Sequence, residues 1–458
     1  MENEALLEKF GLLANERNHQ ELRVYLDDQL ITDIAELIYE DPEQADLIIN
    51  NLSISRAAAA FRILDFPLQE EVIRGLPAAK VAELLNELPA DDRAAFLGEL
   101  PSEAVKELIK LLTPEERRIT LSLLGYPENS VGRIMTPDYI AVREEWSVKH
   151  VLDYIREHGK DSETIDVIYV VDEKGILLDD FRIREFLLVS PDTMVHTLMD
   201  DRFVALHAID EQEEAIQVFR MENRVALPVI DDQGILLGIV TIDDMLWIAN
   251  EEHTEDIQKI GGTEALDEPY LDMPLLKLVK KRVGWLVVLF IGEMLTATAM
   301  GFFEDEIAKA VVLALFVPLI ISSGGNSGSQ ASTLIIQAMA LGEIDINDWW
   351  RVMRREILSG LMLGGILGLI GFIRILLWNS LFHTYGDHTF LIGITVGFSL
   401  IGVVLWGTLS GSMLPLVLKR LGADPATSSA PFVATLVDVT GLLIYFSMAY
   451  AFMQGILL

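Results

Sequence analysis

Five long apolar runs fill the second half of this sequence and constrain its fold more than any other feature. The runs lie at about residues 283–303, 309–341, 356–380, 389–418 and 429–456. Each is long enough to cross a hydrocarbon core of about 30 Å. The sequence therefore predicts a five-helix transmembrane domain over residues 275–458. The second and fourth runs are overlong, so we expect them to tilt, break or extend into water.

Basic residues beside the apolar runs predict how this domain is oriented. They form three clusters: Lys277, Lys280, Lys281 and Arg282; Arg351, Arg354 and Arg355; Lys419 and Arg420. With five spans, all three clusters share one side of the membrane, which the positive-inside rule assigns to the cytoplasm. The acidic N-terminal segment has no signal-type apolar core after it, so we expect the N terminus inside and the C terminus outside.

The chain carries a formal net charge of −35 and has no cysteine. Because the membrane flanks are basic, the acidic excess lies in the first half, which argues against nucleic acid as a partner. Disulfides and thiolate metal sites are excluded. An acidic surface suits cation binding, but it also serves solubility, and charge alone does not decide between the two.

A repeat of about twelve residues marks the N-terminal part of the chain. Its members are Leu76-Pro77, Leu88-Pro89, Leu100-Pro101 and Thr113-Pro114. Proline is tolerated in the first turn of a helix and breaks a helix interior, so the period predicts short stacked helices. We expect an all-α superhelical domain over residues 1–130. Asp91 and Asp92 open one of its helices, and an N-cap role is the simplest interpretation.

A second repeat joins residues 169–178 to residues 228–237, which align without gaps at an offset of 59. Each copy predicts a buried strand, an acidic turn with glycine, a second strand and a helix. Neither copy can bury a core alone, so the two should pack as a pair. With residues 135–137 opening the first copy and residues 238–244 closing the second, the pattern resembles a tandem CBS domain, which we place at residues 131–249.

Such modules often bind adenine nucleotides through a hydroxyl residue and an aspartate, and Thr241 and Asp244 match that pattern. The first copy departs from it, because Asp179 replaces a glycine and Glu185 replaces an aspartate. Arg224 lies where an aromatic side chain would support adenine. The resemblance thus implies ATP as a ligand of the CBS pair through Thr241 and Asp244, while these departures leave nucleotide binding open.

Two carboxylates lie inside the predicted spans, Glu293 in the first and Asp438 in the fifth. Neither has an obvious basic partner at that depth, so each must be protonated, hydrated or paired with a cation. A cation pathway is the best interpretation for Asp438. For Glu293 a carboxyl group hydrogen-bonded between helices is an equal alternative.

A polar, glycine-rich stretch, residues 318–330, also falls at membrane depth in the second span. Irregular backbone survives there only where it is buried in protein or lines water, so its carbonyl and amide groups are candidates for contact with hydrated ions. Close-packed helix is the alternative, as we expect for Gly360, Gly364 and Gly368 in the third span.

The order of these parts, with a connecting helix at residues 250–274, resembles the MgtE-type magnesium channel family. Residues 324–330, 422–426 and 431–441 carry its most specific motifs. The resemblance implies a multidomain membrane protein with an all-α superhelical N domain, an α/β tandem CBS domain, a connecting helix and a five-helix transmembrane domain. It implies a homodimer with one pore in a bacterial cytoplasmic (inner) membrane, with Asp438 and Asn326 binding hydrated Mg²⁺, which gives up its water reluctantly.

The resemblance further implies that cytoplasmic Mg²⁺ closes the pore by bridging acidic side chains. Its expected ligands are Glu252, Glu255, Asp256 and Asp424 at one site and Asp91 and Asp244 at another. Asn223 and Trp247 replace acidic residues of the family pattern, which predicts that one regulatory ion is missing.

Three other functions are alternatives, which the sequence supports to different degrees. An ion-coupled carrier of divalent cations would use similar acids, with Glu293 as a proton carrier. An intramembrane hydrolase would need a catalytic motif within the spans, and none is found in the sequence. A receptor or scaffold would not need the polar membrane motifs.

Overall fold

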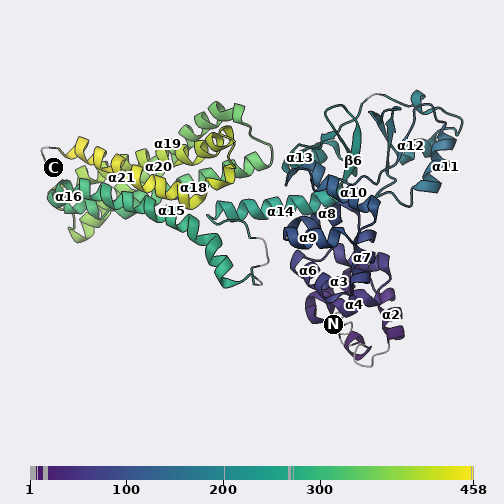
Figure 1. The fold of residues 1–458 in the computed structure, drawn as a ribbon. Coiled ribbons are helices and arrows are strands. Elements are labelled where there is room, and N and C mark those ends of the chain that lie inside the picture. Colours follow the sequence, from purple (N-terminus) through teal and green to yellow (C-terminus); the bar gives the residue numbers. More distant parts are fainter. Residues whose placement is uncertain are drawn as a thin grey trace. The chain divides into compact units, whose positions relative to one another are not determined.

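The computed structural model describes residues 7, 9–13, 19–200, 202–266, 270–271, 273–454 and 456. The chain divides into two compact units, Met1–Ala249 and Asn250–Leu458. The first unit holds short helices and two small sheets, and the second holds long helices (Figure 1).

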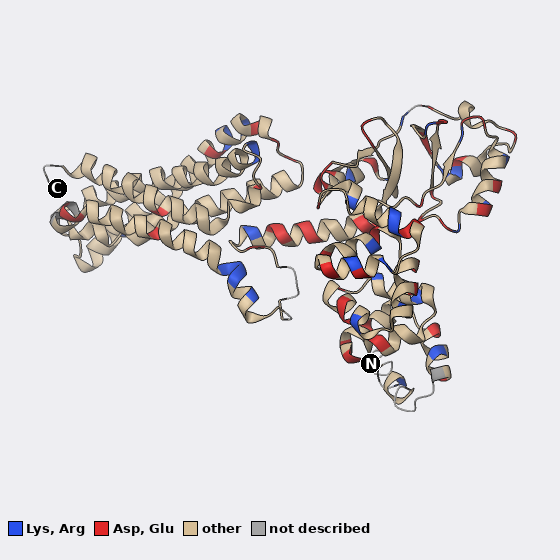
Figure 2. Cartoon of the chain, viewed as in Figure 1, with Lys and Arg blue, Asp and Glu red and all other residues tan. Residues whose placement is uncertain are grey.

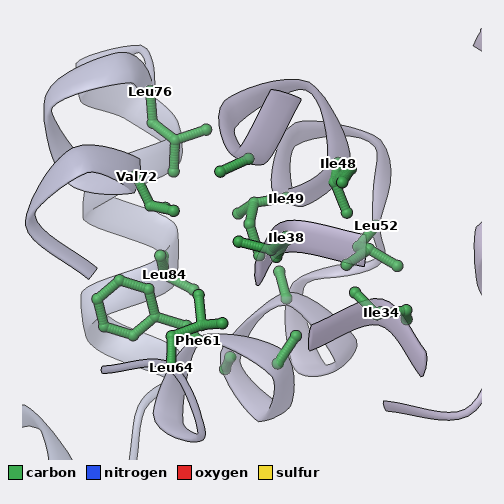
Figure 3. Close-up of a cluster of buried hydrophobic side chains, with 14 of the residues drawn as sticks. Ile34, Ile38, Ile48, Ile49, Leu52, Phe61, Leu64, Val72, Leu76 and Leu84 are labelled. Atoms are coloured by element: carbon green, nitrogen blue, oxygen red, sulfur yellow. The ribbon is translucent and has the colours of Figure 1, made fainter. Parts of the chain in front are cut away.

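Short helices build the N-terminal part of the first unit. They are α2 (His19–Asp28), α3 (Ile31–Glu40), η1 (Pro42–Gln44), α4 (Ala45–Asn51), α5 (Ile54–Arg62), α6 (Phe66–Gly75), α7 (Ala78–Glu87), α8 (Ala90–Glu99), α9 (Ser102–Ile109) and α10 (Pro114–Leu123). Alternate helices pack together: α5 packs between α3 and α7, and α6 packs between α4 and α8. Their apolar side chains, among them Ile38, Ile49, Phe61 and Leu84, form one buried cluster (Figure 3). The predicted stack of helices is confirmed.

The Leu-Pro repeat sets where these helices begin. Pro77, Pro89 and Pro101 each occupy the N-cap position, and the helix starts one residue later. Asp91 and Asp92 consequently lie within the first turn of α8, and neither caps it. The prediction of an N-cap role for these residues was wrong, because the proline has already taken that position.

The rest of the first unit contains two three-stranded sheets. Their elements are η2 (Val131–Arg133), β1 (Ala141–Val142), α11 (Val148–His158), β2 (Val167–Val171), β3 (Leu177–Arg182), α12 (Ile183–Leu188), η3 (Val195–Thr197), β4 (Leu206–His207), α13 (Gln212–Glu222), β5 (Ala226–Ile230), β6 (Leu236–Thr241) and α14 (Ile242–Ile260). In each sheet the first strand is parallel and the last antiparallel to the central one.

The two copies contact each other through their turns. Leu177 N donates to Gly234 O at 2.9 Å, and Leu236 N donates to Gly175 O at 3.0 Å. Gly175 and Gly234 have φ of 85° and 81°, a left-handed conformation that favours glycine. The predicted pairing of the repeats is confirmed.

The second unit contains five helices long and apolar enough to cross a membrane, among the described residues. Its elements after α14 are α15 (Leu275–Phe302), α16 (Glu304–Lys309), α17 (Val311–Ala314), α18 (Val317–Ala340), η4 (Ile346–Asp348), α19 (Trp349–Phe382), η5 (Gly386–His388), α20 (Thr389–Arg420), η6 (Pro425–Thr427) and α21 (Ala430–Met453). The second span breaks between α17 and α18, as its length suggested, whereas the fourth is one helix.

The glycine-rich stretch at residues 318–330 is continuous helix within α18. Of the two interpretations that the sequence left open for this stretch, the structure shows the close-packed helix, in which the glycines serve packing. A Cβ atom at Gly407 would overlap the carbonyl oxygen of Gly324, and one at Gly411 would overlap that of Gly328. α18 and α20 thus touch backbone to backbone, and buried Gly360, Gly364 and Gly368 bring α19 onto α20 in the same way.

We predict that Gly411→Val destabilises the protein by about 1–3 kcal/mol, because the added side chain must separate α18 from α20. Thermal unfolding in detergent, followed by size-exclusion chromatography, should show a lower melting temperature. Gly365→Val in α19 is the matched control, since a Cβ atom there meets nothing within 4 Å. Equal melting temperatures for the two variants would contradict this account of the packing.

Candidate cation sites

Asp438 lies in the first half of α21, at a half-buried position. Ser429 caps this helix by accepting a hydrogen bond from Phe432 N at 3.3 Å. The Asp438 carboxylate lies beside Gly325 of α18, with Oδ1 3.8 Å from where a Cβ atom of residue 325 would stand. Asn326, the next residue of α18, is exposed and its amide nitrogen lies 3.4 Å from Ser322 Oγ. A glycine therefore gives the carboxylate room beside the polar stretch.

The charged group that acts on the Asp438 carboxyl is Glu293 of α15, which carries the same sign. In the central parts of the five long membrane helices few other residues are charged (Figure 2). Like charges at one depth repel, and in hydrocarbon the repulsion is weakly screened. The pair is a candidate position for a cation.

A second candidate lies where the end of α14 meets the loop before α21. Asp424 precedes η6, and its Oδ1 accepts a hydrogen bond from Ala426 N at 2.8 Å. Its Oδ2 accepts one from Lys259 Nζ at 2.6 Å, and the same ammonium group lies 2.5 Å from Glu255 Oε1. Lys259 thus joins Glu255 to Asp424 as a cation bound between two carboxylates would.

The charge balance at this second site favours a further cation. Burial, and next the charge of Asp424, raises the pKa of Asp256 to about 6, although Lys259 opposes the shift. The charges of Glu252 and Glu255 act in the same direction as that of Asp424. Burial disfavours the charged form of Lys259, but its hydrogen bonds to Asp424 and Glu255 outweigh burial and raise its pKa.

A third candidate lies inside the first unit, where α8 meets the start of α14. Asp91 is 5% exposed, and its Oδ1 has no hydrogen-bond partner among the described residues. Burial, followed by the charges of Asp92 and Asp244, raises the pKa of Asp91 well above its usual range. Asp244 Oδ2 accepts a hydrogen bond from Thr241 Oγ1 at 2.6 Å. An unpartnered buried carboxylate oxygen beside like charges fits a hard cation such as Mg²⁺.

The sequence did not point to three other members of this third site. Arg62 Nε lies 2.9 Å from Asp92 Oδ2 and supplies the compensating charge. Burial raises the pKa of Asp92 to about 6 despite Arg62. Glu163 comes from the first CBS copy, where its backbone N donates to Asp138 O, and its charge acts on Asp91. No local pattern in the sequence marks Arg62 or Glu163, because only the fold brings them here.

Three of the departures from the family patterns, at Asn223, Arg224 and Glu185, have local explanations. Asn223 ends α13 with φ of 51°, a left-handed conformation that asparagine tolerates. Trp247 is 65% exposed. Arg224 forms a two-point ion pair with Asp180, with nitrogen–oxygen distances of 2.9 and 3.3 Å. Glu185 Oε1 accepts a hydrogen bond from Arg182 N at the start of α12.

No group of three or more acidic or histidine side chains lies close enough to enclose one metal ion in the described parts of the chain. Mg²⁺ keeps several water molecules when few carboxylates bind it directly. The three candidate sites therefore suit a largely hydrated ion.

These features define a multi-pass membrane protein that handles divalent cations. A family model described as a divalent cation transporter matches residues 317–448, the MgtE intracellular N domain matches residues 30–129, and CBS domains match residues 131–187 and 195–250. The magnesium transporter MgtE of Thermus thermophilus is 39% identical over 351 residues, which cover 77% of this chain and 76% of that one. The magnesium transporter MgtE of Enterococcus faecalis is 30% identical over 340 residues, which cover 74% of this chain and 73% of that one. The chain belongs to the MgtE family of magnesium transporters and is not an enzyme.

Solved structures resemble the first half. A cytosolic domain of the Mg²⁺ channel MgtE in complex with ATP is 33% identical, with a TM-score of 0.51, and covers 53% of this chain and 99% of that one. The soluble part of a magnesium transporter is 23% identical, with a TM-score of 0.51. The match covers 55% of this chain and 99% of that one, and shows that the two share the fold. The expected family and fold class are confirmed.

We predict that the first unit of the chain loses stability in metal-free buffer as the pH rises from about 4 to about 7. Asp91, Asp92, Asp244 and Glu163 have raised pKa values, mainly through burial, and bind protons more tightly when folded. Their contribution to folding is thus complete below about pH 4 and is lost as the pH passes about 6, a change of about 1–3 kcal/mol.

Chemical denaturation of the full chain with EDTA, at pH values across this window, measures the effect. Asp91→Asn should flatten the profile, whereas Glu103→Gln, at an exposed position of α9, should leave it unchanged. A wild-type profile that Asp91→Asn does not alter would contradict the inference that the buried Asp91 carboxyl binds its proton more tightly in the folded state.

Proposed function

We propose that this protein is a homodimeric magnesium channel of a bacterial cytoplasmic membrane, closed by cytoplasmic Mg²⁺. Its N terminus lies in the cytoplasm and its C terminus outside, as the basic clusters indicate. The observation that carries the proposal is the half-buried carboxylate of Asp438, which stands in a membrane helix beside Gly325 with Glu293 as the charge acting on it. The solved relative named as a Mg²⁺ channel supports it.

Asp438 suits a permeating ion because its carboxylate supplies negative charge without surrounding the ion with protein ligands. A twofold axis would place two copies of this residue across one pathway, with Asn326 supplying a neutral oxygen nearby. A hydrated Mg²⁺ ion would contact such a ring through its own water, so it would bind firmly enough to enter and loosely enough to leave. Asp438 is thus the proposed permeation ligand.

Closure follows from the acidic sites outside the membrane. Without ions, Asp91 with Asp244, and Asp256 with Glu252 and Asp424, repel one another. Ions that bind only a compact state stabilise it by RT ln(1 + [Mg²⁺]/Kd), so millimolar Mg²⁺ shifts the population towards that state. We propose that Glu255 belongs to the same regulatory set, and that the compact state is the closed channel.

Adenine nucleotide is a second proposed ligand of the CBS pair. The solved relative with bound ATP supports it, and so does the position of Thr241 and Asp244 at the junction of β6 and α14. Asp244 would then serve both ATP and Mg²⁺, which would couple the two ligands.

We predict that Asp438→Asn reduces passive Mg²⁺ flux into proteoliposomes by on the order of tenfold or more, because the amide cannot attract a divalent cation as the carboxylate does. Asp345→Asn, in the loop before α19, is the control and should conduct as wild type does. Flux driven by a proton gradient would favour the ion-coupled carrier, and flux indifferent to Asp438 would remove the pore assignment.

We predict that Lys259→Met lowers the cytoplasmic Mg²⁺ concentration needed for half closure by about tenfold or less, because a tethered cation no longer competes between Glu255 and Asp424. Lys419→Met removes a similar charge from the last turn of α20 and should change the midpoint little, since the ammonium group that binds Glu255 and Asp424 is that of Lys259. If Lys259 instead only clamps α14 to the loop, its loss will raise the concentration required.

A further inference from the structure

Two contacts fix the register between α15 and α21. Trp285 Nε1 donates to Ser429 Oγ at 3.0 Å, and seven residues later a Cβ atom at Gly292 would stand 2.5 Å from Thr435 Cγ2. Both helices therefore run in the same direction, and equal rise per residue carries them in parallel. Glu293 follows directly after Gly292, so its backbone stands within about one turn of Asp438 in height.

The face of α15 around Glu293 approaches α21 closely. Gly292 permits this approach, since any side chain there would meet Thr435. Glu293 flanks the contact and is exposed, and its charge acts on the Asp438 carboxyl. The two carboxylates thus lie within about one helical turn of each other in height along α15 and α21.

A hydroxyl group at the same place lacks the usual hydrogen bond. Thr298, Thr435 and Thr440 each donate to the carbonyl group four residues earlier. Thr296, three residues after Glu293 on the same face, has a buried Oγ1 with no hydrogen-bond partner among the described residues. The unpartnered oxygen of Thr296, one turn after Glu293 along α15, offers a neutral ligand or a contact for ion-bound water.

We propose that Glu293 is a second carboxylate of the ion pathway, which binds hydrated Mg²⁺ together with Asp438 and sets the preference for divalent over monovalent cations. The proposal rests on the pore function proposed above. Like charges at one depth are costly when alone, and each divalent cation offsets twice the charge that a monovalent cation does. The alternative of a carboxyl group merely hydrogen-bonded between helices gives no reason for the exposure of Glu293.

The test compares wild type, Glu293→Gln and Met294→Gln in proteoliposomes. Met294→Gln places the same amide on the neighbouring, exposed position of α15. Two quantities are measured: the ratio of Mg²⁺ to Na⁺ flux, and the concentration of cobalt hexa-ammine, an inert mimic of hydrated magnesium, that halves Mg²⁺ flux. Loss of one carboxylate should weaken the attraction of a multivalent ion about tenfold. We therefore expect Glu293→Gln to lower the ratio and raise the blocking concentration by that factor, with Met294→Gln near wild type.

Unchanged selectivity and block in Glu293→Gln would overturn the proposal. So would a lower Mg²⁺ flux with both of these quantities unchanged, because that result indicates a structural role. Loss of a proton-gradient requirement in Glu293→Gln would also overturn it and assign Glu293 to proton coupling. Asp438→Asn, measured in parallel, separates the two proposals: if it too conducts as wild type does, the pore assignment fails, whereas if it alone loses flux, only the role of Glu293 fails.

Discussion

A carboxylate that is taken from water without a counter-ion raises the free energy of the state that buries it by several kcal/mol. This cost recurs in each candidate site of the molecule. The negative charge of Glu293 acts on Asp438, that of Asp424 acts on Asp256, and those of Asp92 and Asp244 act on Asp91. In the two sites outside the membrane a basic side chain, Lys259 or Arg62, offsets part of the charge. The remaining excess is what a divalent cation would neutralise.

Close helix packing makes the membrane site possible. Glycines of α18 and α20 bring the two backbones into contact, and Gly325 leaves space beside Asp438. A dry bundle of larger residues would hold the carboxylate away from its neighbours. The glycine-rich stretch therefore contributes to ion handling through packing, while its carbonyl groups stay within the helix. The same residues that let helices associate in lipid thus also shape the candidate pathway.

The sequence predicted elements well where a single physical rule decides them. Apolar length located the five membrane helices, and proline spacing located the starts of α7, α8 and α9. The N-cap prediction failed because Pro89 occupies the position that Asp91 was expected to take. The sequence left the glycine-rich stretch open between helix and irregular backbone, and it is helical. Arg62 and Glu163 could not be predicted as neighbours of Asp91, because their proximity comes from packing between distant segments. The position of Lys259 between Glu255 and Asp424 could not be predicted either, because it depends on how the loop before α21 packs against the end of α14.

Single-channel recording in a planar bilayer tests the central claim most directly, that an acidic, ion-sensing half closes a passive pathway. With a Mg²⁺ gradient and a separate pH gradient, the account predicts currents that reverse at the Mg²⁺ equilibrium potential. It also predicts an open probability that falls as Mg²⁺ on the side of the soluble half rises through the millimolar range. A reversal potential that follows the pH gradient, or an open probability indifferent to Mg²⁺, would contradict it.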